Sequence, residues 1–349
     1  MTLQRHDAMQ EPPEKVAPAP TRGRTLIKTL VAVAVTGATL WFFVALVDLD
    51  LAWQALRRAD LGLVAAAAVL LGLSLAVRSA RLALAIQQRM QFVLVHITAV
   101  FVFLVGLLPA KVGEFSLPLL LRGRLGVGLS YGLGVLVLLR VYDLLFLVVA
   151  GGILVLVYWE ALGLPAVIPW LAATGALAAL AMALALPLLA RLMMIVVPPA
   201  LRRRKKVMAL VDNLMAAATT LTPARHVMLL LWTAALWLVL YTGFHAVSVA
   251  LDATPGWPAS VLAGVAASFA FALPINGVAN LGPFQLAWVA VMVPLGVPIE
   301  AAATAAFLAH GVALVVNALN VGATTAIDAA RRAQALRDAR RSKAAETPL

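Results

Sequence analysis

Long apolar runs recur along the chain, and short stretches with charged or turn-forming residues separate them. A helix needs about 20 apolar residues to cross a bilayer. The runs that reach this length predict about six full spans, at residues 26–47, 61–86, 129–158, 167–197, 226–250 and 300–327. The pattern therefore predicts an all-α polytopic membrane protein. A single membrane domain at 25–328 is expected between a disordered tail at 1–24 and a basic tail at 329–349.

Two further apolar runs break before they can cross. The run at 92–108 stops at Pro109 and Gly113, and only a short apolar arm at 115–121 precedes the next basic residues. As a helix, an arm of that length covers roughly 10 Å, which is too short to span. The run at 260–273 also ends in a break with prolines, glycines and asparagines, and its return arm is again short. Both stretches predict re-entrant helical hairpins.

Blocks of basic residues set the expected orientation, because arginine and lysine gather in cytoplasmic loops. The strongest block lies at 202–206, and further basic residues follow the last span at 331–343. These blocks place both termini in the cytoplasm, the first hairpin on the cytoplasmic side and the second on the outer side. Residues 25–160 and 165–328 then show the same order of spans and hairpin with every direction reversed. This pattern predicts an inverted-topology repeat, in which broken helices meet near the midplane.

Composition agrees with a membrane protein and excludes other classes. Hydrophobic residues make up 63% of the chain and charged residues 12%, whereas a soluble domain has about 25% charged residues. The net charge of +12 lies in blocks beside apolar runs, so that topology explains it and no nucleic-acid partner is expected. Cysteine is absent, as are a P-loop sequence and metal-ligand spacing. We therefore expect no metal, no cofactor, no catalytic residue and no enzyme activity.

Charged side chains inside the expected spans mark the candidate site. Arg78 and Arg81 lie one turn apart on one span, and Arg140 and Asp143 lie one turn apart on another. A charge at membrane depth costs at least about 2.5 kcal/mol, so such side chains normally pair or face a transport path. Because guanidinium binds phosphate, Arg78 and Arg81 are candidates for contact with a lipid phosphate. The alternative is an ion pair with Glu114 or Asp143. Arg140 and Asp143 are expected to pair with each other and to brace the hairpin, and direct contact with the substrate is the alternative that makes them candidate binding residues.

Both breaks add candidate substrate-binding residues. In the first break, Lys111 and Glu114 flank Gly113 at a helix end, where exposed backbone N–H groups suit anions. The second break carries an uncharged polar set: Asn276, Gly277, Asn280 and Gln285. Asparagine and glycine are also ordinary turn residues, so a purely structural role is the alternative there. A cationic inner pocket and a neutral polar outer pocket would favour an anionic head group.

These motifs resemble those of a known family, the flippase-like membrane domain of lysylphosphatidylglycerol synthases and its stand-alone relatives. The resemblance covers nearly all of the membrane region. The matching positions are Arg78 and Arg81; Pro109, Lys111, Gly113 and Glu114; Arg140 and Asp143; and Pro274, Gly277, Gly282 and Gln285. The chain departs from the family at Lys111, where arginine is common, at Leu139, where glutamate is frequent, and at Gln285, where an acidic residue is typical. The last departure leaves no carboxylate at that position of the second hairpin.

The resemblance implies a transporter that moves an anionic membrane lipid, or a lipid-linked head group, between leaflets of the bacterial inner membrane. Synthase members of the family add a soluble aminoacyl-transfer domain, whereas this chain ends in a short basic tail, so no aminoacyl transfer is expected. One alternative is a secondary transporter of a small anionic solute, and a less favoured one is a polyprenyl-phosphate transferase. The lipid, the direction and energy source of transport, and a homo-oligomer or partner protein all stay open.

Overall fold

The computed structural model describes residues 48–108, 112–196, 215–272 and 278–345, together with Gly37, Trp41 and Asp212. This part of the chain contains helices and no strands. The helices long and apolar enough to cross a membrane are α4 (Leu61–Ala85), α7 (Leu129–Tyr158), α11 (Pro223–Ala250) and α14 (Ile299–Ala345). The expected all-α polytopic membrane architecture is confirmed. Apart from Gly37 and Trp41, the expected first span at 26–47 lies outside the described residues.

The starts of α3 (Leu49–Arg58) and α4 show why these helices begin where they do. Asp48 and Asp60 precede them as N-cap residues. The Oδ1 atom of Asp60 accepts hydrogen bonds from the backbone N–H groups of Gly62 and Leu63, at 2.8 and 3.2 Å. The first N–H groups of a helix lack partners within the helix, and an aspartate cap satisfies some of them. Asp60 therefore fixes the residue at which α4 begins. The start of the helix sets the positions of Arg78 and Arg81 along it.

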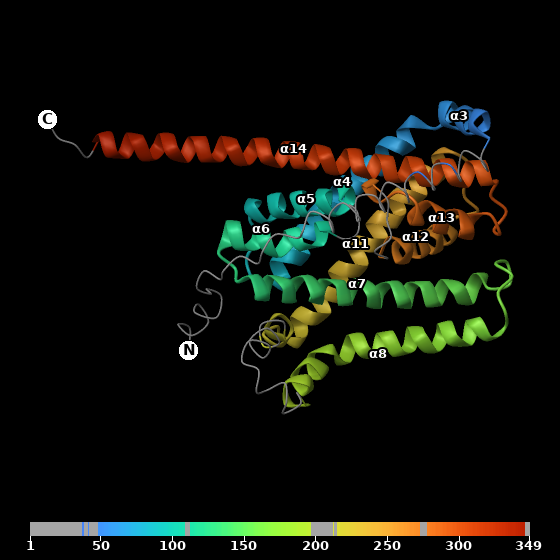
Figure 1. The fold of residues 1–349 in the computed structure, drawn as a ribbon, viewed down its shortest axis with the longest axis horizontal. Coiled ribbons are helices and arrows are strands. Elements are labelled where there is room, and N and C mark those ends of the chain that lie inside the picture. Colours follow the sequence, from blue (N-terminus) through green and yellow to red (C-terminus); the bar gives the residue numbers. More distant parts are fainter. Residues whose placement is uncertain are drawn as a thin grey trace.

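α14 is longer than the span expected at 300–327. Its helix continues without interruption to Ala345, so the basic residues expected in a separate tail extend the same helix. The stretch after Asp328 is rich in alanine and arginine and has no glycine or proline before Ala345. Alanine and arginine are strong helix formers, which accounts for the extension. Figure 1 shows α14 running along one side of the bundle and beyond it.

Each expected hairpin is a pair of short helices around a break. In the first, α5 (Phe92–Leu107) leads to the 3₁₀ helix η1 (Val112–Phe115) and to α6 (Ser116–Leu125). In the second, α12 (Trp257–Ala272) leads to η2 (Val278–Asn280) and to α13 (Pro283–Met292). The arms of each pair pack together, and the pairs lie toward different ends of the bundle (Figure 1). Their entry into a bilayer and the inverted repeat stay predictions.

The remaining helices surround these pairs. α4 packs along α11, and α7 packs along α8 (Val167–Val196), while α14 contacts α4, α5 and α13. One hydrophobic core includes Leu117 and Tyr142, from α6 and α7. Another includes Phe244 of α11 with Phe284 and Trp288 of α13, whose rings stack at 6.3 Å. Since α4, α7 and α11 contribute to both cores, the cores meet in the middle of the bundle.

A glycine explains the tight return of the first hairpin. A Cβ atom on Gly113 would lie under 3.0 Å from backbone atoms of Leu104 and Val105 in α5. No other residue therefore fits between η1 and the end of α5 without a shift of the backbone. This close approach carries the next residue, Glu114, to the side of α7, where the charged residues lie.

Candidate functional site

Among the described residues, two buried charges lie where the two cores meet. Arg81 on α4 lies between Val77 of one core and Leu82 of the other. Asp143 occupies the corresponding boundary on α7. Arg81 is 4% exposed and Asp143 is 6% exposed. Both ionic groups are thus enclosed by helices that are apolar enough to cross a membrane.

Asp143 joins three helices. Its Oδ1 atom lies 2.6 Å from Nη1 of Arg81 on α4. The other terminal nitrogen of Arg81, Nη2, donates to the backbone carbonyl of Leu139 on α7 at 2.5 Å. The indole Nε1–H of Trp237, on α11, donates to the same Oδ1 atom at 3.1 Å. Arg81 therefore makes an ion pair with Asp143. In the sequence analysis this ion pair was the alternative to contact with a lipid phosphate.

Trp237 was not expected at the site. Tryptophans near segment ends commonly anchor a helix at the membrane interface, but Trp237 lies in the middle of α11 (Pro223–Ala250). A buried indole N–H usually needs an acceptor. Its position within a span was therefore the one sequence signal that this tryptophan serves a polar partner.

Arg140 connects the first hairpin to α7. Its Nε and Nη2 atoms donate to the Glu114 carboxylate at 3.0 and 2.6 Å, in a forked arrangement. Its Nη1 atom lies 3.1 Å from Oδ2 of Asp143, one turn along the same helix. The pair expected from the three-residue spacing is thus present. The interaction of Arg140 with Glu114 nevertheless has stronger geometry than its interaction with Asp143, because forked charge-assisted hydrogen bonds are the strongest of this kind.

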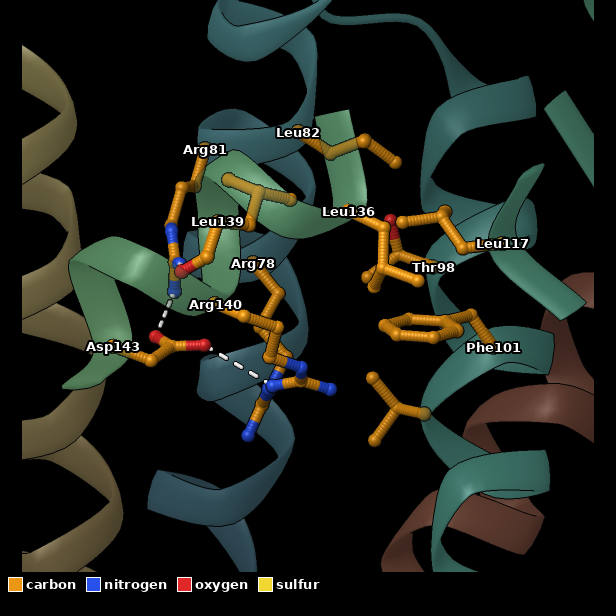
Figure 2. A pocket seen from close by; sticks show the side chains of 11 residues that line it. Arg78, Arg81, Leu82, Thr98, Phe101, Leu117, Leu136, Leu139, Arg140 and Asp143 are labelled. Carbon is orange, nitrogen blue, oxygen red and sulfur yellow. Dashed lines mark hydrogen bonds and ion pairs between the residues drawn. The ribbon is translucent and has the colours of Figure 1, made fainter. Parts of the chain in front are cut away.

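A small cavity opens beside these ion pairs (Figure 2). Its charged and polar lining consists of Arg78, Arg81, Arg140, Asp143 and Thr98, and its other walls are Leu82, Phe101, Val102, Leu117, Leu136 and Leu139. The Arg140 guanidinium lies 5.9 Å from the centre of the Phe101 ring, within reach of a cation–π contact. The volume is about 40 Å³, which is room for about one water molecule. Three guanidinium groups on the lining make the cavity electrostatically suited to an anion.

Two polar residues of the second break, Asn280 and Gln285, are buried. Asn280 has a φ of 56°, and its Nδ2 group donates to the carbonyls of Val105 and Gly106, at 2.7 and 2.9 Å. These carbonyls belong to the last turn of α5, so the second break contacts the end of the helix that leads into the first break. Gln285 is fully buried, and its Oε1 atom accepts a hydrogen bond from the N–H of Gly282 at 2.9 Å. Neither Asn280 nor Gln285 lines the cavity.

The structure thus brings together most of the charged candidates, namely Arg78, Arg81, Glu114, Arg140 and Asp143. Gly113 lies beside them as a packing residue. Lys111, Asn276 and Gly277 lie outside the described residues. Within the described ranges, no group of three or more histidine, cysteine, aspartate or glutamate residues is placed to hold a metal ion.

A separate ion pair links the first hairpin to α14. Nη1 of Arg124, on α6, lies 2.9 Å from Oδ2 of Asp328. Asp328 also pairs with Arg332 at 3.1 Å, one turn along α14. The side chains of Arg124 and Asp328 are 28% and 19% exposed. This pair lies outside the cavity lining and provides a control for the ion pairs around the cavity.

The fold and the site define a polytopic helical membrane protein that holds ion-paired arginines and carboxylates between its spanning helices and a broken one. More specifically, the chain belongs to the family of the lysylphosphatidylglycerol synthase transmembrane region, whose family model matches residues 29–319. The match includes both expected hairpins and every charged residue around the cavity. It confirms the family resemblance of the sequence motifs. No curated protein matches the sequence.

Proposed function

We propose that this protein is a lipid flippase or scramblase-like transporter that moves an anionic phospholipid, or a lipid-linked head group, between the leaflets of the bacterial inner membrane. Family membership supports a role in lipid handling. The observation that carries the proposal is a cavity lined by three arginines inside an apolar helical bundle. Arginine stays charged in such surroundings and binds phosphate oxygens in a fork. The head group would contact this cluster while the acyl chains stay in the bilayer.

The proposal assigns transport and no catalysis to this chain. Anionic membrane lipids are its partners, and both termini face the cytoplasm. Lys111 and the polar residues of the second break, Asn276, Gly277, Asn280 and Gln285, belong to the proposed path of the head group. The hydrogen bonds of Asn280 and Gln285 within the protein mean that these two side chains would have to exchange partners to take part.

The test is leaflet exchange of labelled lipids in liposomes that carry the purified protein. Fluorescent anionic and zwitterionic lipids are followed by loss of outer-leaflet signal to a quencher that does not cross the membrane. We expect faster exchange of the anionic lipid than in empty liposomes, and we expect Arg140→Gln to abolish it. The matched control is Arg124→Gln, which removes an ion-paired arginine of the first hairpin that does not line the cavity, and leaves Asp328 paired with Arg332.

A secondary transporter of a small anionic solute would use the same arginines. It is tested in the same liposomes by uptake of labelled inorganic phosphate and of small organic acids. Uptake of a solute without exchange of any lipid would replace the lipid proposal. The absence of both activities, with the protein folded, would also contradict it.

A further inference from the structure

The charges around the cavity do not balance. Three guanidinium groups, from Arg78, Arg81 and Arg140, face two carboxylates, from Glu114 and Asp143, among the described residues. Both carboxylates are already in ion pairs, and each pair is made with Arg81 or Arg140. The described cluster therefore holds one positive charge in excess. An uncompensated charge at membrane depth costs about 2.5–3.5 kcal/mol on insertion scales, which makes the excess costly to keep without a purpose.

The excess charge lies on Arg78. In the described part of the chain its guanidinium makes no salt bridge and no hydrogen bond, and its Nε atom is buried without a partner. The charges of Asp143, Arg140, Arg81 and Glu114 all lie close enough to act on it. Figure 2 shows Arg78 beside Arg140 with its guanidinium free of dashed contacts, while Arg81 and Arg140 each reach Asp143. Arg78 thus belongs to the cluster electrostatically and has an unused hydrogen-bonding fork.

We infer that Arg78 is the residue that binds the phosphate of the transported lipid, and that the site is matched to a single negative charge, that of a phosphodiester. The inference rests on the proposed function and refines it, because Arg81 and Arg140 become residues that position the site. An anion of one charge neutralises the described cluster. A phosphomonoester, with about −1.5 to −2 charges at pH 7, overshoots, and a zwitterionic head group brings its own cation next to two other arginines.

The size of the cavity adds a condition. A volume of about 40 Å³ is room for about one water molecule, which is less than a whole lipid head group needs. Of the walls, Leu117 belongs to α6 and Phe101 to α5, both arms of the first hairpin, whereas Leu136 belongs to α7. A lipid head group would therefore reach Arg78 by a separation of the hairpin from α7. The forked pair between Arg140 and Glu114 joins these two elements and is the contact that such an opening stretches.

The test compares Arg78→Gln and Arg78→Lys with wild type and with Arg124→Gln, all as full-length protein in liposomes. Labelled phosphatidylglycerol carries one negative phosphodiester, phosphatidic acid is a monoester and phosphatidylcholine is zwitterionic. We expect exchange of phosphatidylglycerol to fall at least tenfold in Arg78→Gln and less in Arg78→Lys, which keeps the charge and loses the fork. Arg124→Gln should behave as wild type. Equal exchange by Arg78→Gln and wild type would overturn the inference while leaving the proposed function in place.

A second readout separates binding from structural support. Arg78→Gln should keep or raise the melting temperature in detergent, because it removes a charge without a partner, whereas a structural arginine would lower it when replaced. Water-soluble short-chain phosphatidylglycerol should raise the melting temperature of wild type and not of Arg78→Gln, and inorganic phosphate at the same concentration should have less effect. If no lipid is exchanged but this stabilisation holds, the proposed transport fails and the Arg78 site stands. Equal stabilisation of both proteins contradicts the site.

Discussion

The replacement Asp143→Asn measures how much the buried ion pairs contribute to stability. Asp143 accepts from Arg81 at 2.6 Å, from Arg140 at 3.1 Å and from Trp237 at 3.1 Å. Asparagine keeps one acceptor oxygen but loses the charge, so Arg81, at 4% exposure, remains without its ion pair. Removal of one partner from a buried ion pair costs about 3–5 kcal/mol. Since 1.4 kcal/mol is a tenfold change, the ratio of folded to unfolded protein should fall at least about 100-fold.

The assay is reversible unfolding in mixed micelles, followed by the loss of helical circular dichroism. The control is Asp328→Asn, which removes a carboxylate from a pair whose side chains are 28% and 19% exposed. Ion pairs that solvent reaches contribute less than buried ones, so we expect a smaller loss for Asp328→Asn. The double replacement Arg81→Gln with Asp143→Asn should recover part of the loss, because residue 81 then no longer carries a charge that has lost its ion pair. A loss for Asp143→Asn no larger than for Asp328→Asn would refute the reasoning.

Three further changes address packing and hydrogen bonding. Gly113→Ala should destabilise the protein by about 1–3 kcal/mol through overlap with α5, whereas Gly123→Ala, with nothing within 4 Å of the added methyl, should be neutral or stabilising in the same unfolding assay. Trp237→Phe removes one charge-assisted hydrogen bond to Asp143 and should cost about 1.5–3 kcal/mol; an unchanged unfolding midpoint would contradict the bond. Asn280→Gly keeps the left-handed backbone and removes the amide, so we expect a loss of about 1–3 kcal/mol and faster amide hydrogen exchange at the end of α5. Exchange as slow as in wild type would show that the Asn280 amide does not protect that end.

Helix positions were predictable because they depend on local signals. The length of the apolar runs and the aspartate cap at Asp60 give the start of α4, and three-residue spacing gives the shared face of Arg140 and Asp143. Partners were less predictable. From the sequence, Glu114 and Asp143 were equally possible partners for Arg78 and Arg81. In the structure, η1 packs closely against α5, and Glu114 forms an ion pair with Arg140.

The contacts that sequence reasoning missed or assigned differently join distant segments. Trp237 reaches a carboxylate 94 residues away, and no local pattern marks that pair. Asn280 was expected as a binding residue of a polar break, yet it bonds to a carbonyl 175 residues away. α14 extends past the end that hydropathy predicted. Hydropathy marks only the apolar part of a helix, whereas alanine and arginine also favour helix outside the membrane.

The hydrogen bonds of Asn280 make the two halves of the chain dependent on each other. One amide group holds two carbonyls at the end of α5, and these carbonyls have no further helical turn to satisfy them. If either break moved alone, both partly buried carbonyls would lose this donor, at a total cost of about 1–3 kcal/mol. Independent motion is therefore the costly route. A conformational cycle of this protein would be concerted, with the first and second breaks rearranging in one step.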